Sequence, residues 1–106
     1  MGGVTAYTKE QFQKINGYSN LFFGWGGEDD DVYGRCMRVF NRVNRQSPQI
    51  GRYYANCHDK EKPNEEREKL LKNSIDRMWK DGLNSLIYNV NKIKKNKLFT
   101  NFLIYY

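Results

Sequence analysis

The clearest pattern along the chain is a helical repeat of apolar residues between Glu28 and Asn41. Its apolar members stand at positions i, i+3, i+4 and i+7, the spacing of one helix face. This spacing predicts an amphipathic helix that turns four side chains towards the core: Tyr33, Cys36, Met37 and Phe40.

Two further helices are predicted on either side of it. The first begins at a capping box formed by Thr8 and Gln11 and ends at Gly17, a residue suited to a helix C-terminus. The second runs from Asn64 to about Lys80. Its apolar face is predicted to consist of Leu71, Ile75, Met78 and Trp79.

Strands are predicted in most of the remaining segments; loops are predicted over 18–27, which is rich in glycine and aromatic residues, and over the polar stretch 59–64, which contains Pro63. The predicted strand or extended segments are 2–6, 42–46, 51–57, 86–93 and 98–105, with a turn at Ser47-Pro48. The last two carry long apolar runs, which are typical of strands buried on both faces. Helices mixed with strands indicate the α/β class, with a mixed sheet and about three helices.

Four consecutive carboxylates, Glu28–Asp31, occupy the first turn of the central predicted helix. The helix dipole favours one or two acids there by roughly 0.3–1 kcal/mol each. Four acids behind a flexible aromatic loop, 22–27, indicate instead a site that binds sugar hydroxyls or a metal ion. Helical spacing separates the acids: Asp29 is expected on the buried side, and Asp31 is expected in a surface ion pair with Arg35.

Length and charge narrow the possible functions. The 106 residues suffice for one small domain, and the formal net charge is +6. Such a charge is compatible with nucleic acid or an acidic membrane surface. The positive residues are spread over predicted helix faces and loops, so no nucleic-acid partner is expected; the one cluster comprises Lys92, Lys94, Lys95 and Lys97.

The two cysteines, Cys36 and Cys57, give no disulfide framework, and Cys36 is expected to be a buried free thiol. No apolar run approaches the roughly 20 residues that span a bilayer. No signal-peptide pattern occurs either.

Three motifs together resemble the C-terminal catalytic region of the beta-1,4-galactosyltransferases. They are Trp25-Gly26-Gly27-Glu28-Asp29-Asp30-Asp31, the preceding Gly2-Gly3-Val4 and the following Asp81-Gly82-Leu83-Asn84-Ser85-Leu86. The resemblance covers nearly the whole chain. It implies that residues 1–106 are the C-terminal part of a GT-A-type nucleotide-sugar transferase fold, a partial domain without its nucleotide-binding half.

The resemblance also implies a function. Family members are inverting, metal-dependent enzymes that move galactose from UDP-galactose to a terminal GlcNAc in beta-1,4 linkage. They lie on the lumenal side of the Golgi membrane, held by an anchor far upstream of the region that this chain resembles. The implied partners are therefore a UDP-sugar donor and a GlcNAc-terminated glycan acceptor.

Site residues follow from the resemblance position by position. Asp29 matches the catalytic base, and Trp25 matches a mobile tryptophan that covers donor and acceptor. The other matched substrate-binding positions are Gly3 and Gly26 near the donor galactose, Glu28 and Asp30 on acceptor hydroxyls, and Arg67 on the N-acetyl group.

Mn²⁺ is the cofactor that the resemblance implies, and His58 matches one of its ligands. Imidazole and carboxylate are suitable ligands for this ion. The chain departs from vertebrate members at Ala55, where they have a methionine that also binds the metal. The family's Asp-x-Asp motif lies upstream, so the chain alone is expected to bind Mn²⁺ poorly.

Several alternatives stay open. UDP-GalNAc is an alternative donor, because the residue that separates the two donors in the family lies upstream of Gly2-Gly3-Val4, outside this chain. An inactive, truncated carbohydrate-binding fragment is an alternative to an enzyme. Arg67 is equally explained as a solvated helix residue, and Glu68 beside it replaces a family aromatic. Trp25 is also explained by ordinary core packing.

Overall fold

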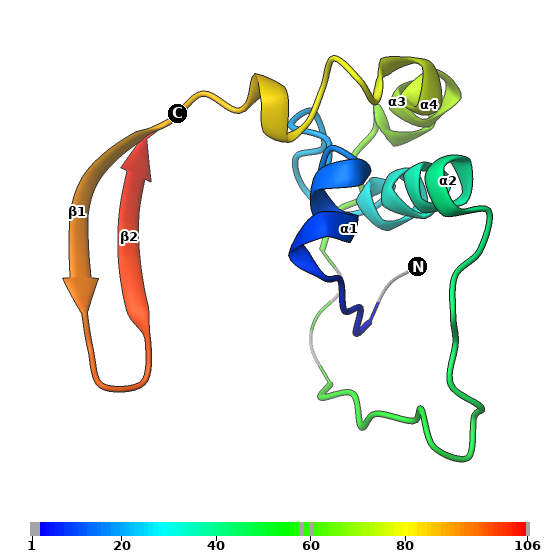
Figure 1. Ribbon diagram of the computed structural model, residues 1–106, viewed down its shortest axis with the longest axis horizontal. Coiled ribbons are helices and arrows are strands. Elements are labelled where there is room, and N and C mark those ends of the chain that lie inside the picture. The colour runs from blue at the N-terminus through cyan, green and yellow to red at the C-terminus, as the bar shows by residue number, and fades with distance from the viewer. Residues whose placement is uncertain (1–2, 58, 60, 106) are drawn as a thin grey trace.

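The computed structural model describes residues 3–57, 59 and 61–105 and shows a small α/β chain (Figure 1). In chain order its elements are α1 (Lys9–Lys14), α2 (Glu28–Phe40), α3 (Arg67–Lys72), α4 (Ser74–Arg77), the 3-10 turn η1 (Leu83–Ser85), β1 (Asn89–Lys95) and β2 (Thr100–Tyr105). The helices pack together, and the two strands form a hairpin that stands apart from them. The α/β prediction is confirmed at this level, but the sheet in the described residues is two-stranded and antiparallel, not the mixed sheet that was predicted.

Helix α1 begins as predicted. The Gln11 backbone N–H donates to Thr8 Oγ1 at 3.2 Å, and the Thr8 N–H donates to Gln11 Oε1 at 2.9 Å, so the capping box is complete. The chain leaves the helix through Gly17, whose N–H donates to the Phe12 carbonyl at 2.9 Å. The predicted stop is therefore confirmed.

Helix α2 has the predicted start and nearly the predicted end, and its buried face is partly the predicted one, since Cys36 is a buried free thiol and Phe40 packs against the core. Its buried residues are Asp31, Val32, Arg35 and Cys36. Tyr33, placed in the predicted core stripe, is 37% exposed, so that part of the prediction is wrong. The apolar spacing failed because this helix buries a charged pair beside its apolar residues.

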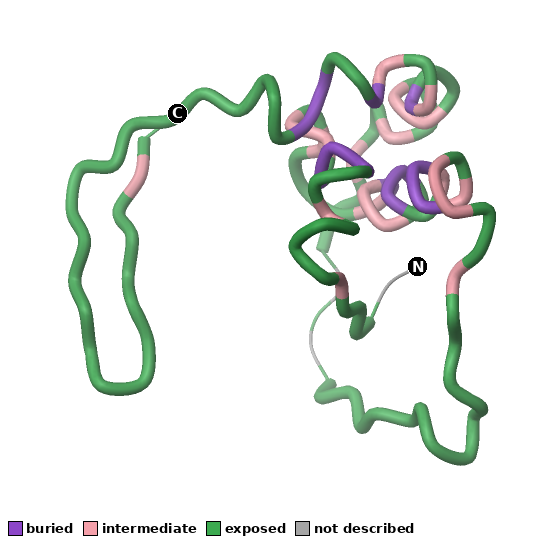
Figure 2. Tube along the Cα trace, in the orientation of Figure 1, coloured by how far each residue is buried: buried purple, intermediate pink, exposed green. Residues whose placement is uncertain are grey.

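The hydrophobic core is small. Ile15, Val32 and Cys36 form one buried cluster, with partly buried side chains around it: Tyr7, Phe12, Val39, Phe40 and Val43. The buried stretches of chain lie around α1, α2 and the segment that follows α4, and the hairpin is almost entirely exposed (Figure 2).

The third predicted helix is broken into α3 and α4 at Asn73, whose φ of −112° and ψ of 15° are not helical. Met78 after α4 is fully buried, as predicted for the apolar face, but Trp79 is 55% exposed. Helix α4 lies close against α2, since a Cβ added to Gly34 would meet Ile75 Cδ1 at 2.7 Å.

The segment between α2 and α3 contains no strand in its described residues, so the strands predicted at 42–46 and 51–57 are wrong. The predicted turn is present: the N–H groups of Ile50 and Gly51 both donate to the Ser47 carbonyl, at 2.9 and 2.8 Å. Strand pairing needs a neighbouring strand, and the described part of the chain places none beside these residues.

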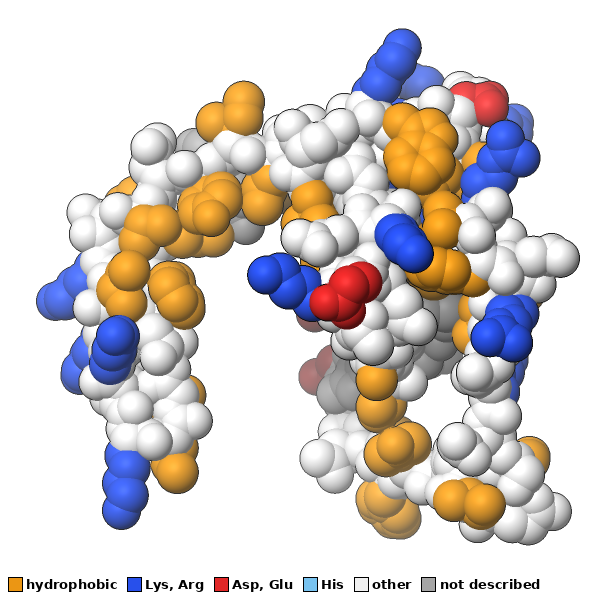
Figure 3. Space-filling view, viewed as in Figure 1, with side chains coloured by type: hydrophobic (Ala, Val, Ile, Leu, Met, Phe, Trp, Pro, Cys, Tyr) orange, Lys and Arg blue, Asp and Glu red, His pale blue; other side chains and the backbone are white. Residues whose placement is uncertain are grey.

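The C-terminal hairpin is confirmed, with narrower limits than predicted. Strands β1 and β2 pair antiparallel, with a register irregularity between Val90 and Lys92. By this register one face carries Val90, Ile93, Phe102 and Ile104. Burial on both faces is wrong here, because all of β1 is exposed. Hydrophobic side chains run along the hairpin, with lysines at its outer edge (Figure 3).

We expect the chain, studied by itself, to associate through this apolar hairpin face. An isolated two-stranded hairpin is marginally stable in water, and an exposed apolar edge promotes aggregation. The measurement is light scattering over a range of concentrations, together with a thermal melt. Association should fall in Phe102→Thr and persist in Leu103→Thr, a matched change on the opposite face. A soluble monomer with a cooperative melt would contradict this expectation.

Candidate functional site

A cavity of about 460 Å³ lies at the N-terminal end of α2. Three separate stretches form its wall: the N-terminal segment, the loop that enters α2, and helix α3. The lining residues are Gly3, Trp25, Gly26, Gly27, Glu28, Asp29, Asp30, Arg67 and Leu71. Every site residue predicted from the sequence lines this cavity, apart from His58, which lies outside the described residues.

Two glycines shape the entrance to α2. Gly26 and Gly27 have φ values of +105° and +95°, in the left-handed region that favours glycine. A Cβ on Gly27 would lie 2.8 Å from Phe22 Cε1 and 3.2 Å from Arg67 Cβ. The loop and α3 therefore approach each other across a position where a side chain does not fit.

Glu28 stabilises this loop as well as lining the cavity. The Gly26 N–H donates to Glu28 Oε2 at 3.1 Å, and Glu28 is half-buried. A carboxylate at a helix start is also favoured by the helix dipole. Glu28 therefore also has a structural role, as a carboxylate favoured in the first turn of a helix.

Trp25 is held by its backbone while its side chain remains accessible. It forms an isolated bridge with Pro63, and the Asn64 N–H donates to the Trp25 carbonyl at 2.8 Å. The side chain is 55% exposed, which is not the burial expected for core packing. A half-exposed indole at the edge of a cavity can stack on a flat ligand face.

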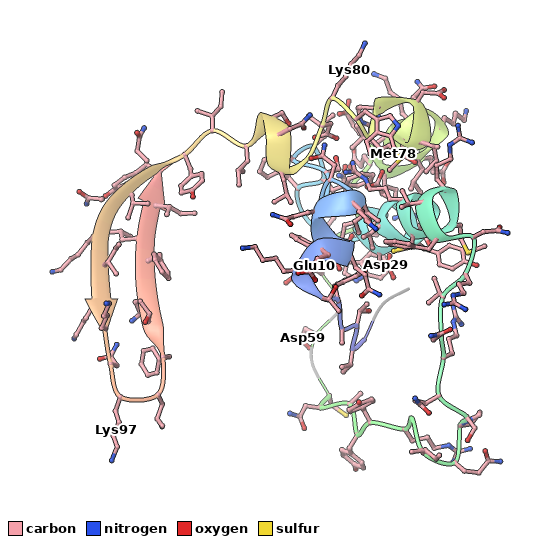
Figure 4. The ribbon with its side chains drawn as sticks, in the orientation of Figure 1. Glu10, Asp29, Asp59, Met78, Lys80 and Lys97 are labelled. Carbon is pink, nitrogen blue, oxygen red and sulfur yellow. The ribbon has the colours of Figure 1, made fainter. Side chains whose placement is uncertain are left out.

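Asp29 and Asp30 differ in exposure. Asp29 is half-buried, in line with the inward placement predicted for it, and Asp30 is exposed. Figure 4 labels Asp29 near the start of α2. Both residues line the cavity.

The prediction for Asp31 is wrong in one respect. Its partner is Arg35, as the spacing indicated, with Arg35 Nε donating to Asp31 Oδ2 at 2.7 Å. The pair is not on the surface, because both side chains are 0% exposed. Burial raises the pKa of Asp31, and the neighbouring guanidinium opposes that shift.

Asp81 completes this buried cluster. Arg35 Nη1 donates to the Asp81 carbonyl at 2.9 Å, and Arg77 Nε donates to Asp81 Oδ2 at 3.1 Å. Burial alone would raise the pKa of Asp81, but hydrogen bonds from Ser19, the Asn20 backbone and Arg77 lower it below its usual value. The i, i+4 spacing of Arg77 and Asp81 was the signal in the sequence that could have indicated this pair.

The motif after α4 is structural. A Cβ on Gly82 would lie 2.0 Å from the Asn16 carbonyl oxygen, so only glycine permits this approach. Asn16 Nδ2 donates to the Met78 carbonyl at 2.8 Å and to Asn84 Oδ1 at 2.7 Å. These contacts join the segment after α4 to the loop after α1.

The described residues contain no group of three or more His, Cys, Asp or Glu side chains that could hold a metal ion. His58, the predicted ligand, lies outside them, so the metal site stays a prediction. Within the described part of the chain, no helix is long and apolar enough to cross a membrane.

A larger cavity, of about 570 Å³, lies elsewhere, between the N-terminal segment, the end of α2 and the segment 42–53. None of the predicted site residues lines it. The described site residues that the sequence predicted therefore line the smaller cavity and not the larger one.

Comparison with known proteins identifies relatives. Residues 1–59 match the family model for the N-terminal domain of galactosyltransferase. The chain is 44% identical over 104 residues to beta-1,4-galactosyltransferase 4 of Cricetulus griseus and 43% identical to that of Homo sapiens; each match covers 94% of this chain. It is 45% identical over 102 residues to beta-1,4-galactosyltransferase 6 of Homo sapiens, again over 94% of this chain. The chain spans 30%, 30% and 26% of the lengths of these three relatives.

Gly27→Ala should destabilise the site more than Gly24→Ala. Both glycines have positive φ, +95° and +77°, so each alanine carries a similar backbone penalty. Only at Gly27 does the new Cβ meet other atoms; Gly24 has none within 4 Å. The expected extra loss is about 1–3 kcal/mol of unfolding free energy, the usual cost of overpacking. Denaturant unfolding of a full-length protein that carries this region measures it, and equal losses would contradict the crowding at Gly27.

Proposed function

The chain belongs to the beta-1,4-galactosyltransferase family, and we propose that it is the C-terminal catalytic region of an enzyme that transfers galactose from UDP-galactose to a terminal GlcNAc. In this proposal residues 1–106 form part of a GT-A-type domain. The relatives are named as transferases of this class. Because the chain spans at most 30% of the length of these relatives, activity is proposed for the full-length enzyme.

The observation that carries the proposal is the composition of the smaller cavity. It collects Trp25, Asp29, Asp30 and Arg67 from two distant parts of the chain. Carboxylates accept hydrogen bonds from sugar hydroxyls, an aromatic face packs against a sugar ring, and a guanidinium donates several hydrogen bonds. This combination suits an acceptor sugar.

Inverting transfer requires a base that takes the proton from the attacking acceptor hydroxyl. We assign this role to Asp29, because it is half-buried in the cavity wall at the start of α2. A positioned carboxylate base contributes typically 10²–10⁴-fold to the rate, as an order of magnitude. The new bond forms between the acceptor oxygen and the galactose anomeric carbon as the bond to the nucleotide diphosphate breaks.

The other cavity residues bind and orient the acceptor in this proposal. Glu28 and Asp30 accept hydrogen bonds from acceptor hydroxyls, and Arg67 lies beside the N-acetyl group. Gly3 and Gly26 leave room near the donor galactose. Trp25 covers both sugars, and its exposed side chain supports that role.

Mn²⁺ is the metal ion of the proposed enzyme, and His58 is the ligand that this chain contributes. A divalent cation supplies Lewis-acid stabilisation of the departing diphosphate. The described residues contain no metal-ligand group of their own, so the rest of the coordination is assigned to other parts of the full-length enzyme. A lumenal Golgi location belongs to the same proposal.

Asp29→Asn should reduce kcat by roughly 10²–10⁴-fold in a full-length enzyme that carries this region, because the amide cannot accept the proton. Donor affinity should change little. The measurement is steady-state galactosyl transfer to a GlcNAc acceptor, with UDP-galactose binding followed by calorimetry.

Asp76→Asn is the matched control, since Asp76 is exposed on α4 away from the cavity. It should leave kcat unchanged. Retention of most of the turnover in Asp29→Asn would overturn the assignment of the base. Equal use of UDP-GalNAc and UDP-galactose by the unmodified enzyme would overturn the assignment of the donor.

His58→Ala should shift activation by Mn²⁺ to higher metal concentration, because the variant loses one imidazole ligand. The measurement is the rate of transfer as a function of Mn²⁺ concentration. Cys57→Ala, the adjacent residue, serves as the control and should leave that curve in place. An unchanged curve in His58→Ala would show that His58 is not a ligand.

A further inference from the structure

Arg35 is completely buried and contacts three parts of the chain. Its Nε donates to Asp31 Oδ2 at 2.7 Å in the first turn of α2. Its Nη1 donates to the carbonyls of Gly17 at 3.3 Å and Asp81 at 2.9 Å. One guanidinium therefore joins α2 to the loops that follow α1 and α4.

The contacts continue from Asp81 to the opposite wall of the cavity. Asp81 Oδ2 accepts from Arg77 Nε at 3.1 Å, and Arg77 Nη2 donates to the Leu70 carbonyl at 3.0 Å. Leu70 belongs to α3, the helix that supplies Arg67 to the cavity. Hydrogen bonds thus run from the buried side of α2 to α3.

The same cluster also fixes the loop that carries Trp25. The Asn20 N–H donates to Asp81 Oδ1 at 2.8 Å, and Ser19 Oγ donates to Asp81 Oδ2. This loop leads directly into Gly26 and Gly27. The acidic first turn of α2 (Glu28–Asp31), the loop 18–27 that carries Trp25 (the tryptophan loop) and α3 are therefore all connected to one buried set of charges.

We propose that Arg35 is a positioning residue, which holds the acidic start of α2 at a fixed place relative to the tryptophan loop and α3. The inference rests on the proposed transferase function. Arg35 does not line the cavity itself, and it acts through Asp31 on the α2 side and through Asp81 and Arg77 on the α3 side.

A lysine cannot replace this arginine. The guanidinium is planar and presents five donors in a rigid fork, whereas an ammonium is a point charge on a flexible stem. In Arg35→Lys the charge beside Asp31 is kept, but simultaneous donation to Asp31 and to two carbonyls is lost. A displacement of about 1 Å at reacting groups can cost on the order of 10²-fold in rate.

The test is steady-state transfer by Arg35→Lys in the full-length enzyme, at a temperature where a melt shows the variant to be folded. We expect kcat to fall roughly tenfold to a hundredfold, and the acceptor KM to rise. Arg38→Lys is the matched control, because Arg38 is exposed on the same helix, and it should behave as wild type. A lower melting temperature with unchanged kcat and KM would show that Arg35 is only structural, and would overturn the proposal.

If Arg35→Lys does not fold, a second variant tests the same proposal. Arg77→Gln loses the contacts to Asp81 and Leu70 at a side chain that is 19% exposed, and it leaves Arg35 with Asp31. The acceptor KM should rise severalfold more than in Lys80→Gln, an exposed control just after α4. Equal acceptor KM values in the two variants would overturn the proposal. Absence of transfer by the unmodified enzyme would instead overturn the proposed function, so the two failures are distinguishable.

Discussion

The buried guanidinium of Arg35 is the constraint on which the described structure depends. A buried charge is strongly destabilising unless it is paired and hydrogen-bonded. Here Asp31 lies 2.7 Å away, and Asp81 and Arg77 complete a cluster of two acids and two bases. Few apolar side chains are fully buried in the described residues, so this cluster determines how α2 sits against the loops. Apolar packing around Ile15 and Val32 then fills the space beside it.

The sequence correctly predicted those features that depend on interactions between residues close together in the chain. The capping box of Thr8, the acidic start of α2 and the C-terminal hairpin each depend on residues close together in the chain, and all three were predicted. The burial of the Asp31–Arg35 pair was not, because the other partners that allow Arg35 to be buried stand 18 and 46 residues away in the chain. Helical periodicity contains no information about such distant carbonyls.

The strands predicted at 42–46 and 51–57 failed for a related reason. An extended segment forms a strand only where a neighbouring strand pairs with its backbone hydrogen-bonding groups. The hairpin contains both of its strands and forms, whereas these segments have no described partner strand. The cavity residues came from a family resemblance, not from periodicity. The structure adds the physical reason that they meet: Gly27 allows the loop and Arg67 to approach closely.

Four adjacent carboxylates repel one another, and the structure shows how the chain tolerates them. Asp31 is neutralised inside the protein by Arg35, and Glu28 accepts a hydrogen bond from the Gly26 N–H at 3.1 Å. The positive end of the α2 dipole lies beside all four. Two of the acids therefore stabilise the turn, and Asp29 and Asp30 line the cavity beside them. The positions of these two carboxylates and the start of α2 are thus tied to the same buried ion pair.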